Sequence, residues 1–269
     1  MNDDIRALLS HIRLFVLDMD GTVYLSDTLI DGASELVSVL SSHPEKEYLF
    51  FSNNASRTAA QYAAKLSRLG CHVPEEKILT AGDVTAQFLL QNHPGARIFL
   101  NGTKELADDW RSKGLLLTDD HPDIAVQSFD LSMTYERMEK ICRFIREGAL
   151  FYATHPDINC PVEGGFIPDC GAMCALISAS TGKTPVFFGK PSAQTVDRIE
   201  ALTGIPGEQI AFVGDRIYTD IAAGIKNGAK GILVLTGETD EEMLRRSDIR
   251  PDAVFTGVKE LAARVSEAG

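Results

Sequence analysis

RLFVLDMDGT, residues 13–22, places two aspartates and a glycine directly after an apolar run. A continuous apolar run before the first acid is typical of a strand buried on both faces, as in a parallel sheet. Asp18 and Asp20 lie two positions apart, so in an extended chain their side chains point to the same side. One carboxylate could attack an electrophile while the other moves a proton, and a divalent metal could bridge them to a substrate. An Asp–Gly turn at a strand end is the purely structural alternative.

The rest of the chain repeats this layout, with short apolar runs alternating with amphipathic stretches. Because each run is apolar without alternation, we expect further strands at residues 47–52, 210–215, 231–235 and 253–255. Apolar residues at helical spacing occur at 59–69 and 196–202, and a glycine follows each pattern. The predicted fold class is therefore α/β, with a doubly wound, Rossmann-like parallel sheet.

Polar residues follow four of the expected strands, and their spacing indicates an insertion. They are Asp18, Ser52, Asp215 and Lys190, the last of which follows an expected strand at 186–188. The carboxyl ends of parallel strands form the binding crevice of an open α/β sheet, so these side chains are expected to converge. Ser52 and Lys190 are 138 positions apart, which is too far for one crossover.

We therefore expect a core formed by residues 1–81 and 185–269, interrupted by an inserted domain at residues 82–184. The insert has its own α/β rhythm. Its expected strands are 97–100, 123–126 and 150–154, and its expected helix is 135–146.

A second acidic motif, GDRIYTD at residues 214–220, follows the expected strand at 210–215. Asp215 at a strand end and Asp220 near the start of a helix supply the oxygen ligands that Mg²⁺ prefers. The alternative for Asp220, or for Thr219 before it, is an N-cap of a helix at 221–226.

Two further segments suit a phosphoryl group. Lys190 stands between a glycine and a proline, where its compact charge could balance phosphate and carboxylate oxygens. Ser52, Asn53 and Asn54 lie between a strand and a helix, where a hydroxyl and backbone N–H groups can bind phosphoryl oxygens. The alternatives are a solvated surface lysine and ordinary helix-entry polar residues.

In this order the four motifs resemble those of the haloacid dehalogenase-like phosphatase superfamily. The sequence has DMDGT at 18–22, SNN at 52–54, GKP at 189–191 and GDRIYTD at 214–220. DMDGTVY, FFSNNASRT, FYATHPD, FIPDCGAM, FFGKP and FVGDRIYTDI further resemble the NagD / 4-nitrophenylphosphatase branch. The resemblance covers nearly the whole chain and implies that the insert is a C2-type cap.

The resemblance implies a Mg²⁺-dependent phosphatase that forms an aspartyl-phosphate. Asp18 would be the nucleophile. Asp20 would protonate the leaving oxygen and then activate water. Ser52 and Lys190 would hold the phosphoryl group.

The resemblance also implies the ligands of the metal. Asp18, Asp215 and the backbone carbonyl of Asp20 would bind Mg²⁺. Asp220 would support the metal's water shell or orient Lys190. A cation, a lysine and backbone donors are the expected stabilisers of charge on equatorial phosphoryl oxygens.

In the insert, residues 154–161 (THPDINCP) contain the side chains that we expect to contact the leaving group of the substrate. Related sequences often have ATNPD where this chain has Ala153-Thr154-His155-Pro156-Asp157. We therefore expect His155 and Asp157 to contact the substrate, together with Asn53 and Asn54. An exposed loop histidine is the alternative for His155, whose ring titrates near neutral pH.

Composition limits the partners. The formal net charge of −12 disfavours a general nucleic-acid or anionic-membrane surface. The resemblance implies that the partner is a small phosphorylated metabolite. We expect a cytoplasmic protein, because the chain begins with acidic residues and contains no long apolar run. The five cysteines contain no C-x-x-C pair, which favours reduced thiols over a zinc site. Caps of the resembled type often support dimers, so a homodimer through the cap is an expectation.

Two other classes of function remain open at this point. A receiver-like signalling module also combines Asp, Ser or Thr, Lys and Mg²⁺, but it needs neither Asp20 nor a large insert. A catalytically idle metal-binding or interaction protein would not need all four motifs intact. Sugar phosphates, nucleoside monophosphates, glycolytic phosphates and aryl phosphates are all open as substrates.

Overall fold

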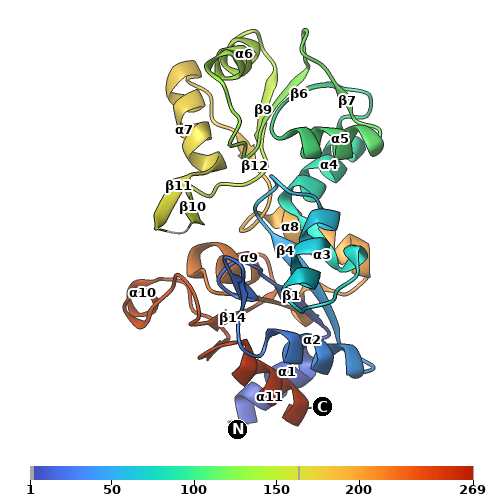
Figure 1. Ribbon diagram of the computed structural model, residues 1–269, viewed down its shortest axis with the longest axis vertical. Coiled ribbons are helices and arrows are strands. Elements are labelled where there is room, and N and C mark those ends of the chain that lie inside the picture. Colours follow the sequence, from blue (N-terminus) through green and yellow to red (C-terminus); the bar gives the residue numbers. More distant parts are fainter. Residues whose placement is uncertain (1–2, 163, 269) are drawn as a thin grey trace. The chain divides into compact units, whose positions relative to one another are not determined.

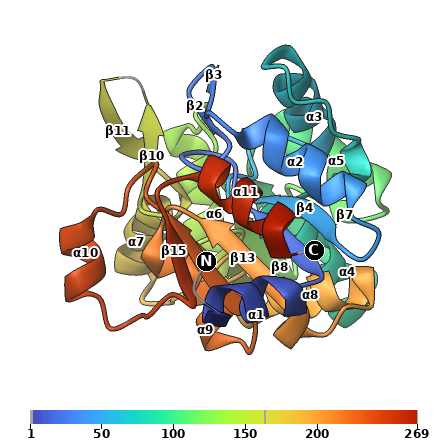
Figure 2. The same cartoon turned by 90° about the horizontal axis from the view of Figure 1, so that it is seen from below.

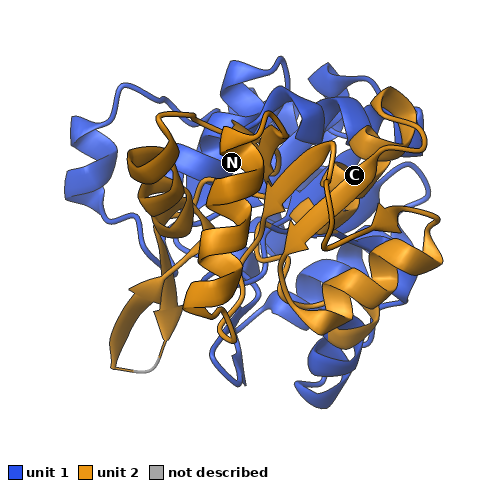
Figure 3. Cartoon of the chain, turned by 90° about the horizontal axis from the view of Figure 1, so that it is seen from above, with its two compact units in different colours: residues 1–52, 62–79, 190–269 blue, residues 53–61, 80–189 orange. Residues whose placement is uncertain are grey.

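The computed structural model describes residues 3–162 and 164–268 and divides the chain into two compact units (Figure 3). Unit 1 consists of residues 1–52, 62–79 and 190–269, and unit 2 consists of residues 53–61 and 80–189. The sequence predicts boundaries near 82 and 184. The division by contacts lies a few residues away from these positions and also assigns the short segment 53–61 to unit 2.

Unit 1 is built on a six-stranded sheet with the order β15-β14-β13-β1-β4-β5. Each pairing from β15 through to β4 is parallel. The strands are β1 (Leu14–Leu17), β4 (Glu47–Ser52), β5 (Ile78–Thr80), β13 (Ile210–Gly214), β14 (Lys230–Val234) and β15 (Ala253–Phe255). All four residues of β1 and all five of β13 are buried, which explains their uninterrupted apolar sequence.

The helices of unit 1 cover this sheet. They are α1 (Asp3–His11), α2 (Ala33–Ser42), α8 (Ala193–Thr203), α9 (Ala222–Lys226), α10 (Glu241–Arg246) and α11 (Val258–Ala268). Helix α3 (Ala59–Arg68) begins in the 53–61 segment, and β2 (Tyr24–Leu25) pairs with β3 (Thr28–Leu29) after the DMDGT motif. Helix α11 packs between α1 and α2, so the first and the last described helices lie side by side (Figures 1 and 2).

The order of the strands creates a switch point at the centre of the sheet. From β1 the chain continues outward to β4 and β5, and from β13 it continues in the opposite direction to β14 and β15. Right-handed crossovers in opposite directions place helices on opposite faces of the sheet and leave a crevice where the directions diverge. Asp18 follows β1 and Asp215 follows β13, so both acids stand at this crevice.

Unit 2 has its own parallel sheet with the order β12-β9-β8-β6-β7. The strands are β6 (Arg97–Asn101), β7 (Leu116–Leu117), β8 (Ile124–Gln127), β9 (Leu150–Ala153) and β12 (Val186–Phe187). The α/β class predicted from the sequence is confirmed in both units. The strand expected at 186–188 pairs with β9, so it belongs to this second sheet and not to the core sheet that the sequence suggested.

Helices cover both faces of the second sheet. They are α4 (Ala81–Asn92), α5 (Lys104–Ser112), α6 (Tyr135–Arg146) and α7 (Cys170–Thr181). Phe151 and Tyr152 are consecutive on β9 and therefore point to opposite faces. Phe151 lies in a cluster with residues of α6 and α7, whereas Tyr152 makes an edge contact with Phe88 of α4.

A two-stranded hairpin connects β9 to α7. Its strands are β10 (Asn159–Val162) and β11 (Gly165–Pro168), which pair in antiparallel fashion. Glycine and proline in these strands weaken the alternating pattern by which a strand is recognised in a sequence. None of the described helices combines the length and apolar character that a membrane span requires.

Candidate active site

Lys190 joins two of the predicted acids in unit 1. Its Nζ lies 2.5 Å from Oδ1 of Asp18 and 2.6 Å from Oδ1 of Asp220, and it also donates to the carbonyl of Phe51 at 3.2 Å. The lysine side chain is 2% exposed, so it is not the solvated surface lysine considered above. A buried ammonium requires paired anions. The structure supplies these from segments that are distant in the sequence.

Asp220 lies in a π-helical turn at Ile217–Ile221, directly before α9. Its Oδ2 accepts a hydrogen bond from the backbone N–H of Arg216 at 3.0 Å. Residue 221 holds the N-cap position of α9 and makes no capping bond with its side chain. The carboxylate of Asp220 is therefore directed to Lys190 and to the turn before the helix, and not to the helix N-terminus.

The carboxylate of Asp215 is held by the DMDGT motif and by the turn that follows β14. Its Oδ1 accepts from the hydroxyl of Thr22 at 3.2 Å, and its Oδ2 accepts from the backbone N–H of Glu238 at 2.7 Å. Two glycines leave room for the carboxylate. A Cβ on Gly21 or on Gly237 would come within 2.6 or 2.0 Å of Oδ2. The motif glycine at position 21 is thus required both by its φ of +86° and by this close approach.

The three carboxylates of Asp18, Asp215 and Asp220 lie close together. Each offers an oxygen within 4.8 Å of the others. Burial raises the pKa of Asp18 well above its usual range, with Asp220 as the next cause, although Lys190 acts in the opposite direction. Burial and Asp220 likewise raise the pKa of Asp215 to about 6. Burial alone would lower the pKa of Lys190, but Asp18 and Asp220 outweigh burial and raise it.

Asp20 lies beside an aromatic cluster. Its Oδ2 accepts a hydrogen bond of 3.0 Å from the phenol of Tyr24, which is fully buried. The ammonium of Lys65 lies 3.6 Å from the centroid of the Tyr24 ring. Ser52 ends β4, and its hydroxyl lies 3.4 Å from the phenol oxygen of Tyr62. The predicted acid–base group and the predicted phosphoryl-binding hydroxyl are therefore both flanked by tyrosines.

The predicted substrate residues of unit 2 fall into two groups. Asn53 donates from Nδ2 to both carboxylate oxygens of Asp157, at 3.2 and 3.3 Å, although the two residues are 104 positions apart. Asn54 instead accepts at Oδ1 from the backbone N–H and the hydroxyl of Ser56, at 2.9 and 2.6 Å. The structure thus brings Asn53 and Asp157 together, whereas Asn54 shapes the local turn.

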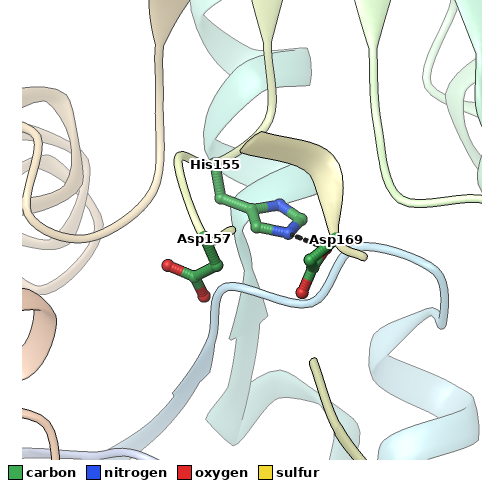
Figure 4. A group of neighbouring side chains, drawn as sticks. All are labelled: His155, Asp157 and Asp169. Carbon is green, nitrogen blue, oxygen red and sulfur yellow. Dashed lines mark hydrogen bonds and ion pairs between the residues drawn. The ribbon is translucent and has the colours of Figure 1, made fainter. Parts of the chain in front are cut away.

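His155 is completely buried, which excludes the exposed loop histidine considered above. Nδ1 lies 2.9 Å from the hydroxyl of Thr154, and Nε2 lies 2.9 Å from Oδ1 of Asp169. In Figure 4 the edge of the ring points toward Asp169, while the carboxylate of Asp157 points away from the ring. Both ring nitrogens are therefore engaged within unit 2.

Comparisons with known proteins agree with this geometry. Residues 15–115 match the family described as haloacid dehalogenase-like hydrolase, and residues 187–261 match a HAD-hydrolase-like family. The chain is 31% identical to an acid sugar phosphatase of Staphylococcus saprophyticus, across 94% of this chain and 98% of that protein.

Solved structures give the same result. A 4-nitrophenylphosphatase from Thermotoga maritima is 44% identical, with a TM-score of 0.92 across 96% of this chain and 99% of that one. A glycerol phosphate phosphatase from Mycobacterium tuberculosis, solved with calcium, is 29% identical, with a TM-score of 0.87 across 94% of this chain and 76% of that one.

The chain belongs to the haloacid dehalogenase-like hydrolases. Among them it lies in the branch that contains the 4-nitrophenylphosphatases. The family and the enzyme class predicted from the sequence, a phosphoric monoester hydrolase, are confirmed.

The acids of this haloacid dehalogenase-like hydrolase fit the divalent metal that phosphatases of the family use. With all three carboxylates ionised, Asp18, Asp215, Asp220 and Lys190 carry a net charge of −2. Burial, followed by the negative charge of Asp220, raises the pKa values of Asp18 and Asp215, and a divalent cation would offset both effects. The cradle around the Asp215 carboxylate, which a Cβ on Gly237 would fill, is a second observation in favour of a hard cation here.

Several functional neighbours were not predicted from the sequence. Thr22 and Tyr24 lie within the DMDGTVY motif, but a hydroxyl next to acids has no distinctive spacing that would mark it in a sequence. Asp169 directly precedes the apolar run of α7, and it accepts from the backbone N–H of Cys170 at 2.6 Å. That position is a helix-start signal, which could have marked Asp169 as an N-cap residue.

A separate pocket of about 480 Å³ in unit 2 has a basic lining. Each of its cations already has partners. Lys104 and Arg111 pair with Asp108, and Lys140 pairs with Glu136. Arg137 donates to three oxygens of residues 100–102 and pairs with Asp130. Acids outside the lining therefore neutralise most of its positive charge, and we assign no ligand to this pocket.

Proposed function

We propose that this protein is a Mg²⁺-dependent phosphatase that hydrolyses a small phosphate monoester through an aspartyl-phosphate. The observation that carries the proposal is the position of Lys190, which is buried between Asp18 and Asp220, two acids that each offer an oxygen within 4.8 Å of one of Asp215. In this arrangement Lys190 lowers the pKa of the Asp18 carboxylate, against the effect of burial, and presents positive charge to a phosphoryl group.

In the first half-reaction an oxygen of Asp18 forms a bond to phosphorus as the bond to the leaving oxygen breaks. Asp20 donates its proton to that oxygen, so the product leaves as an alcohol. Lys190 and Ser52 hold the phosphoryl oxygens, where charge is spread in the transition state.

In the second half-reaction Asp20, now ionised, takes a proton from water, and the water oxygen forms a bond to phosphorus. The bond from phosphorus to Asp18 breaks, which releases phosphate and restores the carboxylate. The hydrogen bond from Tyr24 holds Asp20 in one orientation for both proton transfers.

Asp18, Asp215 and the backbone carbonyl of Asp20 would hold Mg²⁺, which when bound supplies positive charge against the phosphoryl oxygens. Asp220 would orient Lys190. Unit 2 would act as the cap, and Asp157 and Asn53 would contact the leaving group. A ring nitrogen of His155 lies within 4.8 Å of a carboxylate oxygen of Asp157. The names of the relatives favour sugar and aryl phosphates as the first substrates to examine.

The test is hydrolysis of p-nitrophenyl phosphate and of a panel of sugar phosphates, with Mg²⁺ and with excess EDTA. We expect turnover that EDTA abolishes and Mg²⁺ restores, and no turnover by Asp18→Asn. Acid quenching with a radiolabelled ester should trap phosphate on the wild-type chain. A trapped phosphoryl group that persists for hours would favour a receiver-like module over an enzyme.

The proposal also covers the location, assembly and partners of the protein. We expect a cytoplasmic location, a homodimer through the cap and the absence of nucleic-acid or membrane partners. The net charge of −12 supports the last of these.

A further inference from the structure

We propose that His155 and Asp169 form a positioning pair that holds Asp157 in place to select leaving groups that carry hydroxyl groups. The inference rests on the proposed function, in which Asp157 reads the leaving group. It differs from the expectation that His155 itself touches the substrate, and it gives a role to Asp169, which the sequence did not single out.

The pair ties the loop after β9 to the start of α7. His155 accepts or donates at Nδ1 with Thr154 and is bonded at Nε2 to Asp169, both at 2.9 Å. Asp169 is the N-cap residue of α7, since its Oδ1 also accepts from the backbone N–H of Cys170. One carboxylate oxygen thus fixes both the ring of His155 and the first turn of the helix.

The backbone of Asp157 is fixed by the same helix. The N–H of Gly171 donates to the carbonyl of Asp157 at 2.7 Å, and the N–H of Asp169 donates to the carbonyl of Ile158 at 2.9 Å. A Cβ on Gly171 would lie 2.1 Å from the carbonyl oxygen of Pro156, so only glycine permits this approach. Residues 155–158 therefore follow any movement of the α7 N-terminus.

The side chain of Asp157 is held from another direction by Asn53, whose Nδ2 donates to both carboxylate oxygens. The side chain of Asn53 is closely packed against Gly189, because a Cβ on Gly189 would lie 2.8 Å from Oδ1 of Asn53. A carboxylate with a fixed backbone and a fixed amide donor presents its acceptor oxygens in one orientation. Such an acceptor discriminates strongly for substrates that donate hydrogen bonds.

Charge supports an ion pair over a metal site at this position. The ligand atoms of His155, Asp157 and Asp169 lie within 4.8 Å of one another, which is also compatible with a metal ion. Burial of the ring lowers the pKa of His155. The charge of Cys170, the hydrogen bond to Asp169 and the charge of Asp169 outweigh burial and raise this pKa to about 9. Both ring nitrogens of His155 already have hydrogen-bond partners, Thr154 and Asp169, and a protonated ring neutralises the buried Asp169.

The experiment compares kcat and KM for p-nitrophenyl phosphate with those for sugar phosphates. The nitrophenyl group offers no hydroxyl to Asp157. For His155→Asn, whose shorter side chain cannot reach Asp169, we expect kcat/KM on sugar phosphates to fall about tenfold, mainly through KM. On p-nitrophenyl phosphate we expect a change below about twofold.

Three further variants separate positioning from folding. Asp157→Ala should reproduce the loss, and adding His155→Asn to it should cause no further loss in discrimination. Asp169→Asn keeps the N-cap acceptor and should retain most of the discrimination. Asp123→Asn removes an aspartate–arginine pair at the amino-terminal end of β8, whereas His155 follows the carboxyl end of the neighbouring β9, and it should change activity on neither substrate class.

Hydrogen exchange gives a readout that does not depend on activity. The N–H of Gly171, which donates to Asp157, should exchange at least about tenfold faster in His155→Asn, while amides in the middle of α7 keep their protection. Equal losses on all substrates, additive effects with Asp157→Ala, or unchanged exchange at Gly171 would each overturn the inference. Wild-type protein without phosphatase activity would refute the proposed function, while the exchange measurement would still decide whether the pair positions Asp157.

Discussion

The phenol of Tyr24 donates a hydrogen bond of 3.0 Å to Oδ2 of Asp20, only four positions earlier in the chain. The short pairing of β2 with β3 folds this segment back, and residue 20 forms an isolated bridge with residue 24. A carboxylate that must deliver and then accept a proton benefits from one fixed orientation. Tyr24 supplies that constraint from within the same motif.

We predict that Tyr24→Phe lowers kcat/KM about tenfold for an alkyl phosphate and less for an aryl phosphate, since the aryl leaving group needs less protonation. The matched control is Tyr48→Phe, because Tyr48 packs edge-on against Phe50 on β4 away from the acids. A Tyr24→Phe loss that is equal on both esters would assign Tyr24 to folding.

Asp18→Asn should abolish turnover and trapping of the phosphoryl enzyme, while the fold is retained. The loss should reach several powers of ten, because the covalent route is removed. Steady-state kinetics, acid quenching and circular dichroism check the three statements. Activity close to wild type, after a contaminating phosphatase has been excluded, would contradict the nucleophile assignment.

Asp20→Asn keeps the nucleophile but removes the proton donor and base. We expect losses of about 10²–10⁴-fold, larger for an alkyl than for an aryl phosphate. Adding Tyr24→Phe to this variant should cost little more, because the phenol acts through Asp20. Strictly additive losses would show that Tyr24 acts elsewhere.

Gly237→Ala tests the cradle around Asp215. Its Cβ would lie 2.0 Å from Oδ2 of Asp215, so the carboxylate must move. We expect the Mg²⁺ concentration for half-maximal activity to rise about 10–100-fold, as for other changes that displace a ligand. Gly70→Ala, at a φ of +89° with no described atom within 4 Å of the added Cβ, controls for the general cost of replacing a glycine.

The His155–Asp169 pair predicts a pH dependence of stability. The pKa of His155 is about 9 in the folded chain against 6.5 for a free histidine. The pair therefore stabilises the fold fully below pH 6.5, and this stabilisation is lost as the pH rises through 9. The loss is on the order of 3 kcal/mol.

Thermal unfolding between pH 6 and 10 measures this effect as the difference between wild type and His155→Asn. The difference cancels other groups that titrate in the same range. We expect it to shrink steadily above about pH 7. A difference that stays constant with pH would show that His155 is neutral in the folded protein.

The sequence by itself determined the α/β class, five of the six strands of the core sheet and the order of the four motifs. Runs such as 14–17 and 210–214 are apolar throughout because both faces are buried, and this local signal survives in any context. The acids that end these strands could be predicted because the direction of a strand dictates which end faces the crevice.

Only the tertiary structure decided which groups meet. The contacts of Lys190 with Asp18 and Asp220 join residues up to 172 positions apart, and no periodicity records such a distance. The sequence predicted that His155 lies in a loop and contacts the substrate. In the structure His155 is completely buried, and its partner is Asp169 at the N-terminus of α7. The short strand at 186–187 joined the second sheet because two apolar residues have no preference between sheets until a neighbouring strand offers its edge.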